Sequence, residues 1–378
     1  MRVLDMTALI SGPLCSQVLA DLGAEVIRVE SAGSDVMRFV APLHQGMSAF
    51  FEQVNRGKKS ITVDLKSDEG RAMVHKLADS SDIFLQNSRP GVMERLGFGY
   101  EALRKSNPRL IYVAISGFGE TGPFVNRPAY DAVIQGITGF MPIQGGVGGD
   151  PVAIRSVIAD KITAMSAANA TVAALYHRDH DEGRGQKVSV NMASAFSAFM
   201  LVDQMHDHTF VSSGMEPTPR SGSLGSYRLL DTADGQVIGM VLQPSQCERF
   251  LTALGRPDMV SDERFATMPS IGRHMDLLYD TVADTVAAMT TEAFLALMEE
   301  NSIPYGKVNT TAEFLASPEA LHSQAYVDVE DPELGTVRHL NYPARFERSP
   351  ADATRRAPKL GEHNDEILAP LRQPAGAG

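Results

Sequence analysis

The stretch RVLDMTALISGPLCSQVLADLGAEVIRVE (residues 2–30) predicts a strand, a helix and a second strand in succession. Arg2–Met6 is mostly apolar, and Pro13 then stands in a first helical turn, where its missing N–H leaves no hydrogen bond unmade. Leucine and valine recur on one face of that helix, and Gly23 suits the position just after its end. Ala24–Glu30 is β-branched and apolar, which is typical of a strand. Two strands joined by a helix in this way lie parallel in one sheet.

The same alternation of strands and helices continues to about residue 120. It predicts an α/β fold whose large domain holds a Rossmann-like parallel sheet covered by helices. Further strands are expected at Ser60–Leu65, Asp82–Gln86, Arg109–Ser116 and Lys187–Met192, and helices at Asp68–Leu77, Tyr130–Phe140 and Asp160–His177.

A second, smaller α+β domain is expected because 378 residues are too many for one compact core. Thr218–Gly225 is rich in proline, glycine and serine and marks a linker. A hairpin turning at Asp234-Gly235 follows, and helical patterns continue to about Glu300. The expected parts are therefore a large domain (1–217), a small domain (218–325) and a C-terminal segment (326–378).

The composition excludes several classes of protein. A formal net charge of −12 disfavours a nucleic-acid partner, because phosphate contacts need a basic face. The two cysteines, Cys15 and Cys247, give neither a disulfide framework nor a zinc knuckle. Residues 1–20 lack the apolar core of a signal peptide, and the apolar run near Ala193–Val202 is too short for a bilayer. We therefore expect a cytoplasmic protein that does not enter a membrane.

Asp160 is the strongest candidate for a chemical role, with two interpretations. It precedes an alanine-rich helix, where aspartate commonly caps unpaired backbone N–H groups. The same position also favours the ionised carboxylate, which could act as a nucleophile on a thioester.

The basic segment Asn55–Lys59, followed by Lys66, also has two interpretations. It is either a solvated turn or a phosphate-binding surface, to which Arg28, Arg38 and Arg95 would add. Neither a G-x-G-x-x-G nor a G-x-x-x-x-G-K-[ST] motif is present, which disfavours a dinucleotide dehydrogenase or a P-loop enzyme. His206-Asp207-His208 has no evident third ligand, so no metal site is expected.

The motifs, taken in order, resemble the class III CoA-transferases over nearly the whole chain. The resemblance rests on the opening unit quoted above and on several later stretches: residues 55–66, 86–97, 116–123, 127–131, 183–188 and 358–364. It implies that the enzyme moves CoA from an acyl-CoA to a small carboxylic acid. It also implies a ring-like subunit in an interlocked homodimer, with the C-terminal segment returning to the large domain.

The resemblance also assigns site residues. Asp160 falls at the family's nucleophilic aspartate, Gln17 at a glutamine near the thioester, and Tyr130 at an active-site tyrosine. Coenzyme A would be held at or beside Arg38, Leu65, Lys66, Asn87, Arg95 and Leu96. The implied reaction begins with attack of Asp160 on the thioester to give a mixed anhydride, followed by return of the CoA thiolate to give an aspartyl-CoA thioester.

Two departures from the family pattern bear on the substrate. The racemase members carry a His-Asp pair where this chain has Tyr130-Asp131, so a two-base proton exchange lacks one base. The glycine run of formyl-CoA transferases is replaced by Ser221–Gly225, which disfavours oxalate and formate. A 2-methylacyl-CoA racemase, a non-catalytic CoA-binding protein and an NAD-dependent oxidoreductase remain alternatives.

Overall fold

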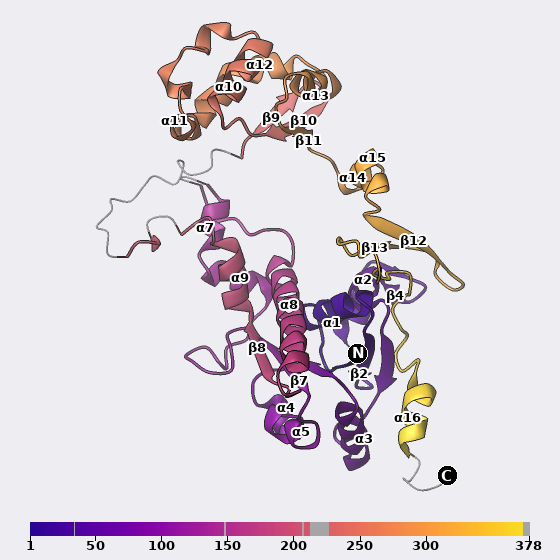
Figure 1. Cartoon of the computed structure of the whole chain (residues 1–378). Helices are drawn as coiled ribbons and strands as arrows, with labels where there is room; N and C mark the ends of the chain where they lie inside the picture. Colours follow the sequence, from indigo (N-terminus) through magenta and orange to yellow (C-terminus); the bar gives the residue numbers. More distant parts are fainter. Residues whose placement is uncertain (34, 147–148, 206–207, 212–226, 373–378) are drawn as a thin grey trace. The chain divides into compact units, whose positions relative to one another are not determined.

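The computed structural model describes residues 1–33, 35–146, 149–205, 208–211 and 227–372 (Figure 1). Its contacts divide the chain into two units. Unit 1 combines Met1–Gln204 with Glu319–Gly378, and unit 2 is Met205–Pro318. The linker expected at Thr218–Gly225, and with it the boundary between residues 217 and 218, lies outside the described residues.

Unit 1 is built on a six-stranded sheet with the order β5-β2-β1-β6-β7-β8. All neighbouring strands run parallel, which confirms the predicted α/β fold with a parallel sheet. The strands are β1 (Arg2–Asp5), β2 (Glu25–Glu30), β5 (Lys59–Thr62), β6 (Ile83–Gln86), β7 (Ile111–Ser116) and β8 (Lys187–Asn191).

Helices cover both faces of this sheet, because alternate side chains of each strand point to opposite faces. On one face, Val3 and the other strand side chains that point the same way pack against α1 (Ser11–Asp21) and α8 (Ile158–His180). On the other face, Leu4 and the strand side chains beside it pack against α3 (Asp68–Asp79), α5 (Tyr100–Ser106) and α16 (Asn364–Arg372). Buried alanines of α8 allow it to lie close against α1.

Shorter elements fill the connections of unit 1. They are the 3-10 helix η1 (Val36–Phe39), the strands β3 (Leu43–His44) and β4 (Met47–Ser48), and the helices α2 (Ala49–Asn55), α4 (Val92–Arg95), α6 (Asp131–Ile137), α7 (Phe140–Gln144) and α9 (Met192–Met200). The helix expected at Tyr130–Phe140 is present as α6, which ends at Ile137, and α7 follows it. Gly139, with a φ of 80°, breaks the chain direction between them, because this left-handed conformation ends a helix.

The last part of unit 1 returns to the sheet. It consists of α15 (Pro318–His322), a hairpin of β12 (Tyr326–Asp331) and β13 (Gly335–Leu340), and α16. The His363 N–H donates to the Ser60 carbonyl on the edge strand β5, at 2.9 Å. Leu368 of α16 is buried in the core beneath it.

Unit 2 is an α+β unit. A three-stranded antiparallel sheet of β9 (Leu229–Thr232), β10 (Gly235–Gly239) and β11 (Tyr305–Lys307) has the order β11-β10-β9. The helices around its core are α10 (Pro244–Ala253), α11 (Met268–Arg273), α12 (Met275–Ala287) and α13 (Thr291–Glu300), with the 3-10 helices η4 (Pro257–Met259) and η5 (Glu263–Phe265) and a peripheral α14 (Thr311–Leu315). Within the described ranges, no helix is long and apolar enough to cross a membrane.

Candidate active site

Asp160 lies in the first turn of α8 and does not cap that helix. The N-cap residue is Val157, which makes no side-chain cap. Instead, one carboxylate oxygen of Asp131 accepts hydrogen bonds from the backbone N–H groups of Ala159, at 2.6 Å, and Asp160, at 3.1 Å. The capping interpretation of Asp160 is therefore wrong, and its own carboxylate remains available for another role.

The Asp160 carboxylate faces the start of α1. The first N–H groups of a helix have no acceptor within it, so this end carries partial positive charge. Ser11 is the first residue of α1, and its hydroxyl and backbone N–H lower the pKa of the Asp160 carboxylate. The start of a helix that is distant in sequence therefore lies beside the candidate nucleophile.

Opposing influences set the proton affinity of Asp160. Burial raises its pKa, the nearby Asp131 carboxylate raises it further, and the hydrogen bonds from Ser11 lower it, to give a pKa of about 6. The group is therefore mostly ionised at neutral pH. Its raised proton affinity also makes it more basic, and hence a better nucleophile, than an ordinary aspartate.

Gly12 allows α1 to begin at this position. A Cβ atom on Gly12 would stand 2.4 Å from Thr7, so only glycine permits this approach. Thr7 is in turn fixed by Asp5, which accepts from the Thr7 backbone N–H at 2.9 Å. Burial alone would raise the pKa of Asp5, but the buried Lys58 and Arg28 bring it to about 2. A buried carboxylate that stays charged thus anchors the loop before α1.

The strand order reverses beside this loop. β2 and β5 lie to one side of β1, and β6, β7 and β8 to the other, which makes the β1–β6 junction the switch point of the sheet. Ligands of open parallel sheets bind outside the carboxyl ends of the strands at such points. Asn87, just after β6, is bound to Ala8, just after β1, by hydrogen bonds of 2.9 and 2.7 Å. Asn87 therefore holds the switch-point loop in place.

The residues expected to hold coenzyme A all follow carboxyl ends of strands in the sheet of unit 1. Arg38 lies after β2, Leu65 and Lys66 after β5, and Asn87, Arg95 and Leu96 after β6. Lys66 and Arg95 are exposed, whereas the side chains of Leu65 and Leu96 pack against the core.

Arg38 is engaged on several sides. Its guanidinium donates to both oxygens of Glu30, at 2.6 and 2.9 Å, and to the Pro358 carbonyl at 3.0 Å. It also lies over the Phe51 ring. A cavity of ≈ 330 Å³ opens beside it, lined by Arg38, Phe39, Gln45, Gly46, Met47, Glu333, Leu334, Arg356, Lys359 and Leu360.

The basic segment Asn55–Lys59 fits neither the solvated turn nor the phosphate-binding surface expected as alternatives, because its charged side chains are buried or paired. Arg56 is buried and pairs with Asp21 at 2.6 Å. Lys58 is buried beneath α1, where burial lowers its pKa to about 8. Lys59 pairs with Glu25 and Glu366. Arg28 is likewise fully buried, and it pairs with Asp35.

Gln17 and Tyr130 lie in contrasting surroundings. Gln17 is buried on α1, one turn before Asp21. Burial raises the pKa of Asp21, and the Gln17 amide offsets only part of that rise. Ser11 is among the groups that shift the pKa of Asp160, and Gln17 is not. Tyr130 stands at the start of α6 with its side chain exposed, directly before the capping Asp131.

Sequence reasoning missed three residues of this site. In the sequence, Asp131 stands out only as half of a Tyr-Asp pair, and neither Ser11 nor Gln135 is singled out by a motif. The available signal was the position of Asp131 in a family motif, because a carboxylate there must find a partner once buried.

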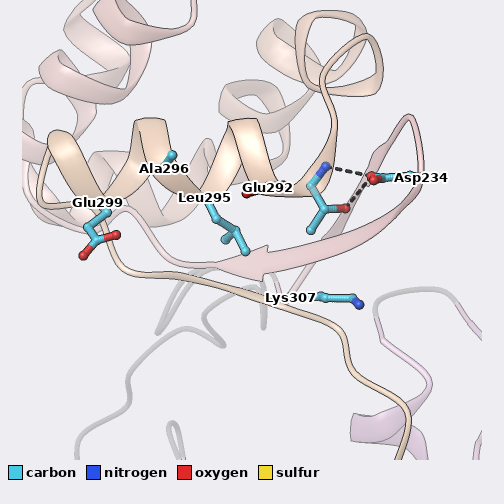
Figure 2. A pocket seen from close by; sticks show the side chains of 7 residues that line it. Asp234, Glu292, Leu295, Ala296, Glu299 and Lys307 are labelled. Carbon is cyan, nitrogen blue, oxygen red and sulfur yellow. Dashed lines mark hydrogen bonds between the residues drawn. The ribbon is translucent and has the colours of Figure 1, made fainter. Parts of the chain in front are cut away.

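Unit 2 contains a separate cavity of ≈ 470 Å³ (Figure 2). Its lining comes from the β9–β10 turn, α13 and β11, with Asp234, Glu292, Glu299 and Lys307 as its charged residues. Asp234 is fixed by two hydrogen bonds from Thr291, at 2.7 and 2.8 Å, and Lys307 pairs with Glu313. The lining includes none of the expected site residues. Among the residues that the structure describes, no group of three or more His, Cys, Asp or Glu side chains could hold a metal ion.

Fold and site together define an enzyme class. Residues 1–364 match the profile of CoA-transferase family III, and the chain belongs to that family. It is an enzyme that transfers CoA between an acyl-CoA and a carboxylic acid, as the sequence predicted.

Relatives with named activities support this class. The chain is 34% identical to the succinyl-CoA–D-citramalate CoA-transferase of Chloroflexus aurantiacus, covering 98% of this chain and 92% of that protein. It is 32% identical to the succinate–glutarate CoA-transferase of Agrobacterium fabrum, covering 98% and 94%. Among solved structures, a CAIB/BAIF family protein from Brucella suis is similar, with a TM-score of 0.86, 31% identity and 98% of each chain covered.

Proposed function

We propose that the transferase acts through a covalent intermediate on Asp160. The observation that supports this proposal is the Asp160 carboxylate in the first turn of α8, whose pKa of about 6 leaves it mostly charged at neutral pH. One oxygen of Asp160 attacks the thioester carbon, the C–S bond breaks, and a mixed anhydride and a CoA thiolate form. The thiolate then attacks the aspartyl carbonyl, which releases the donor acid and leaves an aspartyl-CoA thioester.

The second half of the reaction reverses these steps. The acceptor carboxylate attacks the aspartyl-CoA carbonyl, which expels the thiolate and forms a new anhydride. The thiolate then attacks the acceptor's carbonyl carbon, which gives the new acyl-CoA and frees Asp160. The Ser11 N–H, which lowers the pKa of this carboxylate, would bind the oxygen on which negative charge develops.

Coenzyme A would lie along the carboxyl edge of the sheet in unit 1. The exposed Lys66 and Arg95, with Arg38, supply positive charge for its phosphates. Leu65 and Leu96 would line its path, and Asn87 would act by fixing the switch-point loop. Tyr130 would border the acyl group, and Gln17 would support the thioester end from within α1.

The donor and acceptor are proposed to be succinyl-CoA and a second dicarboxylic acid. Two of the relatives described above are named for succinate or succinyl-CoA and another dicarboxylic acid. The assembly is proposed to be the interlocked homodimer of ring-like subunits that the family resemblance implies. Exposed apolar side chains on α8 and α9, including Val172, Tyr176 and Phe199, are compatible with coverage by a second chain.

The test is mass spectrometry of the protein incubated with succinyl-CoA. The wild type should carry an adduct on the peptide containing Asp160, which hydroxylamine cleaves. Asp160→Ala should lose both the adduct and the transfer activity while still binding CoA. Transfer at the wild-type rate by this variant would disprove the proposal. Exposed Asp284→Ala serves as the matched control and should behave as wild type.

A further inference from the structure

Two residues one turn apart on α6 hold the backbone that leads into Asp160. Asp131 and Gln135 are 8% and 2% exposed, so both polar side chains depend on protein partners. They also bind each other, because the Gln135 amide N–H donates to the second carboxylate oxygen of Asp131 at 2.5 Å. We call this pair the α6 clamp.

Gln135 binds the chain just before α8. Its amide oxygen accepts from the Ile154 N–H at 2.9 Å, and its amide nitrogen lies 3.3 Å from the Ile154 carbonyl and 3.2 Å from that of Ser156. Residues 151–153 just before this segment are exposed. The approach to α8 is therefore fixed by hydrogen bonds as well as by core packing.

Asp131 continues the same contact into α8. Its other oxygen accepts from the Ala159 and Asp160 N–H groups, as described above. The two side chains of the clamp thus bind backbone groups from residue 154 to residue 160. Three of these groups are donors in the nucleophile's own segment, at positions 154, 159 and 160.

Building on the covalent mechanism proposed above, we propose that Asp131 and Gln135 are positioning residues that fix the 154–160 backbone and thereby keep the Asp160 carboxylate against Ser11. In this proposal the two side chains contact neither the attacking Asp160 oxygen nor the thioester carbon, and they act only by positioning Asp160. Attack on a thioester requires close alignment of carboxylate and carbonyl carbon. A misplacement of about 1 Å lowers such rates by about 100-fold.

The two members of the clamp differ in charge, which separates positioning from mere support of the fold. Asp131 is the charged neighbour that, after burial, raises the pKa of Asp160. Gln135 is neutral and changes only the geometry. The groups facing Asp160 from its neighbouring elements are Asp131 on α6 and Ser11 on α1.

The experiment compares Gln135→Ala and Asp131→Asn with the wild type. Adduct formation from succinyl-CoA is timed by mass spectrometry in a single turnover, and kcat and KM are measured on both sides of the Asp160 pKa. Exposed Gln144→Ala and Asp284→Asn are the matched controls. Thermal unfolding of each variant shows whether it is folded.

We expect Gln135→Ala to slow adduct formation by about 10- to 100-fold, with little change in KM. The acid limb of the pH profile, where kcat falls as Asp160 becomes protonated, should not move. Asp131→Asn turns an amide NH₂ toward the Gln135 nitrogen and removes the negative charge. It should lower kcat and also move the acid limb of the profile to lower pH. The double variant should lose less than the product of the single losses, because the pair acts as a unit.

The outcomes separate this proposal from the covalent mechanism. If the wild type forms the adduct and both variants match their controls in rate and pH profile, the clamp proposal alone is overturned. A lower kcat for Asp131→Asn with an unmoved acid limb supports positioning by geometry alone, which is the pattern also expected for Gln135→Ala. If the wild type transfers CoA without an adduct, the covalent mechanism and the clamp proposal fall together. Should Gln135→Ala fail to fold, the Asp131→Asn profile decides.

Discussion

At the scale of single residues, the site depends on a carboxylate whose surroundings oppose its charge. Burial and the Asp131 carboxylate raise the pKa of Asp160, while Ser11 lowers it. Such a group lowers the stability of the folded protein wherever it is ionised, because the unfolded chain solvates the charge better. Reactivity and stability therefore conflict at this position.

Replacing Asp160 by asparagine should raise stability at neutral pH. The pKa of Asp160 is about 6 in the folded protein against its ordinary value of 3.8, so the folded state binds the proton more tightly. The destabilisation is absent below 3.8, grows as the pH rises to about 6, and is constant above that. The unfolding temperature of Asp160→Asn should therefore be higher than that of the wild type at pH 7 and equal to it at acidic pH. An equal unfolding temperature at both pH values would contradict this, and Asp284→Asn is the control.

Single residues also show what the sequence could and could not reveal. The motif around Asp160 marks it as the candidate nucleophile, and the proposal above keeps it in that role. Ser11 and Asp131 meet it only after folding, and no spacing in the sequence records that contact. Composition misled at Arg56 and Lys58, because a run of basic residues does not show which of them are buried against acidic partners.

At the scale of elements, the start of α1 determines where the Asp160 carboxylate is bound. Gly12 lets this helix pass against Thr7. Ser11, the residue before Gly12, supplies the hydroxyl and backbone N–H that lower the pKa of Asp160. A glycine within a helix normally lowers stability by about 1 kcal/mol relative to alanine. Its presence here is explained by the close approach.

Gly12→Ala should therefore destabilise the protein, although helix propensity alone predicts the opposite. The new Cβ would lie 2.4 Å from Thr7, and forced displacements of this kind cost about 1–3 kcal/mol. Urea unfolding measures the loss, and transfer activity should fall with it because Ser11 shifts. Gly306→Ala, with open space around it, is the control. An increase in stability would show that α1 does not need this contact.

Most of the large-domain elements could be predicted, because their apolar periodicities are strong. The first β-α-β unit and the long helix at α8 were expected close to their observed bounds. The expected helix at Tyr130–Phe140 is present as α6, but it ends at Ile137, and the apolar pattern does not reveal the left-handed Gly139 that separates it from α7. Sheet order could not be predicted, because it depends on contacts between strands that lie far apart in sequence.

At the scale of the whole molecule, unit 1 is completed by the end of the chain. Leu368 of α16 is buried with the side chains of α3 and β5 in one core. His363 and Asn364 bind the backbone of β5, through Ser60 and Thr62. The C-terminal segment is therefore a structural part of unit 1.

Leu368→Ala should destabilise unit 1 even though the residue is close to the end of the chain. Loss of a buried leucine costs about 2–5 kcal/mol. Urea unfolding followed by a probe in unit 1 should show a lower midpoint, whereas exposed Leu321→Ala should have little effect. An unchanged midpoint for Leu368→Ala would mean that α16 frays without consequence for the sheet.

The hydrogen bonds between residues 363–364 and β5 carry a consequence for biosynthesis. β5 is an outer strand of the sheet, and these late residues supply partners for its backbone. A ribosome releases the first sixty residues long before it makes the last ones. Until then, β5 of the nascent chain is an edge strand with unpaired backbone groups, and such strands can pair with those of other unfinished chains. Translation through residues 363 and 364 is thus the step that supplies partners for this outer strand.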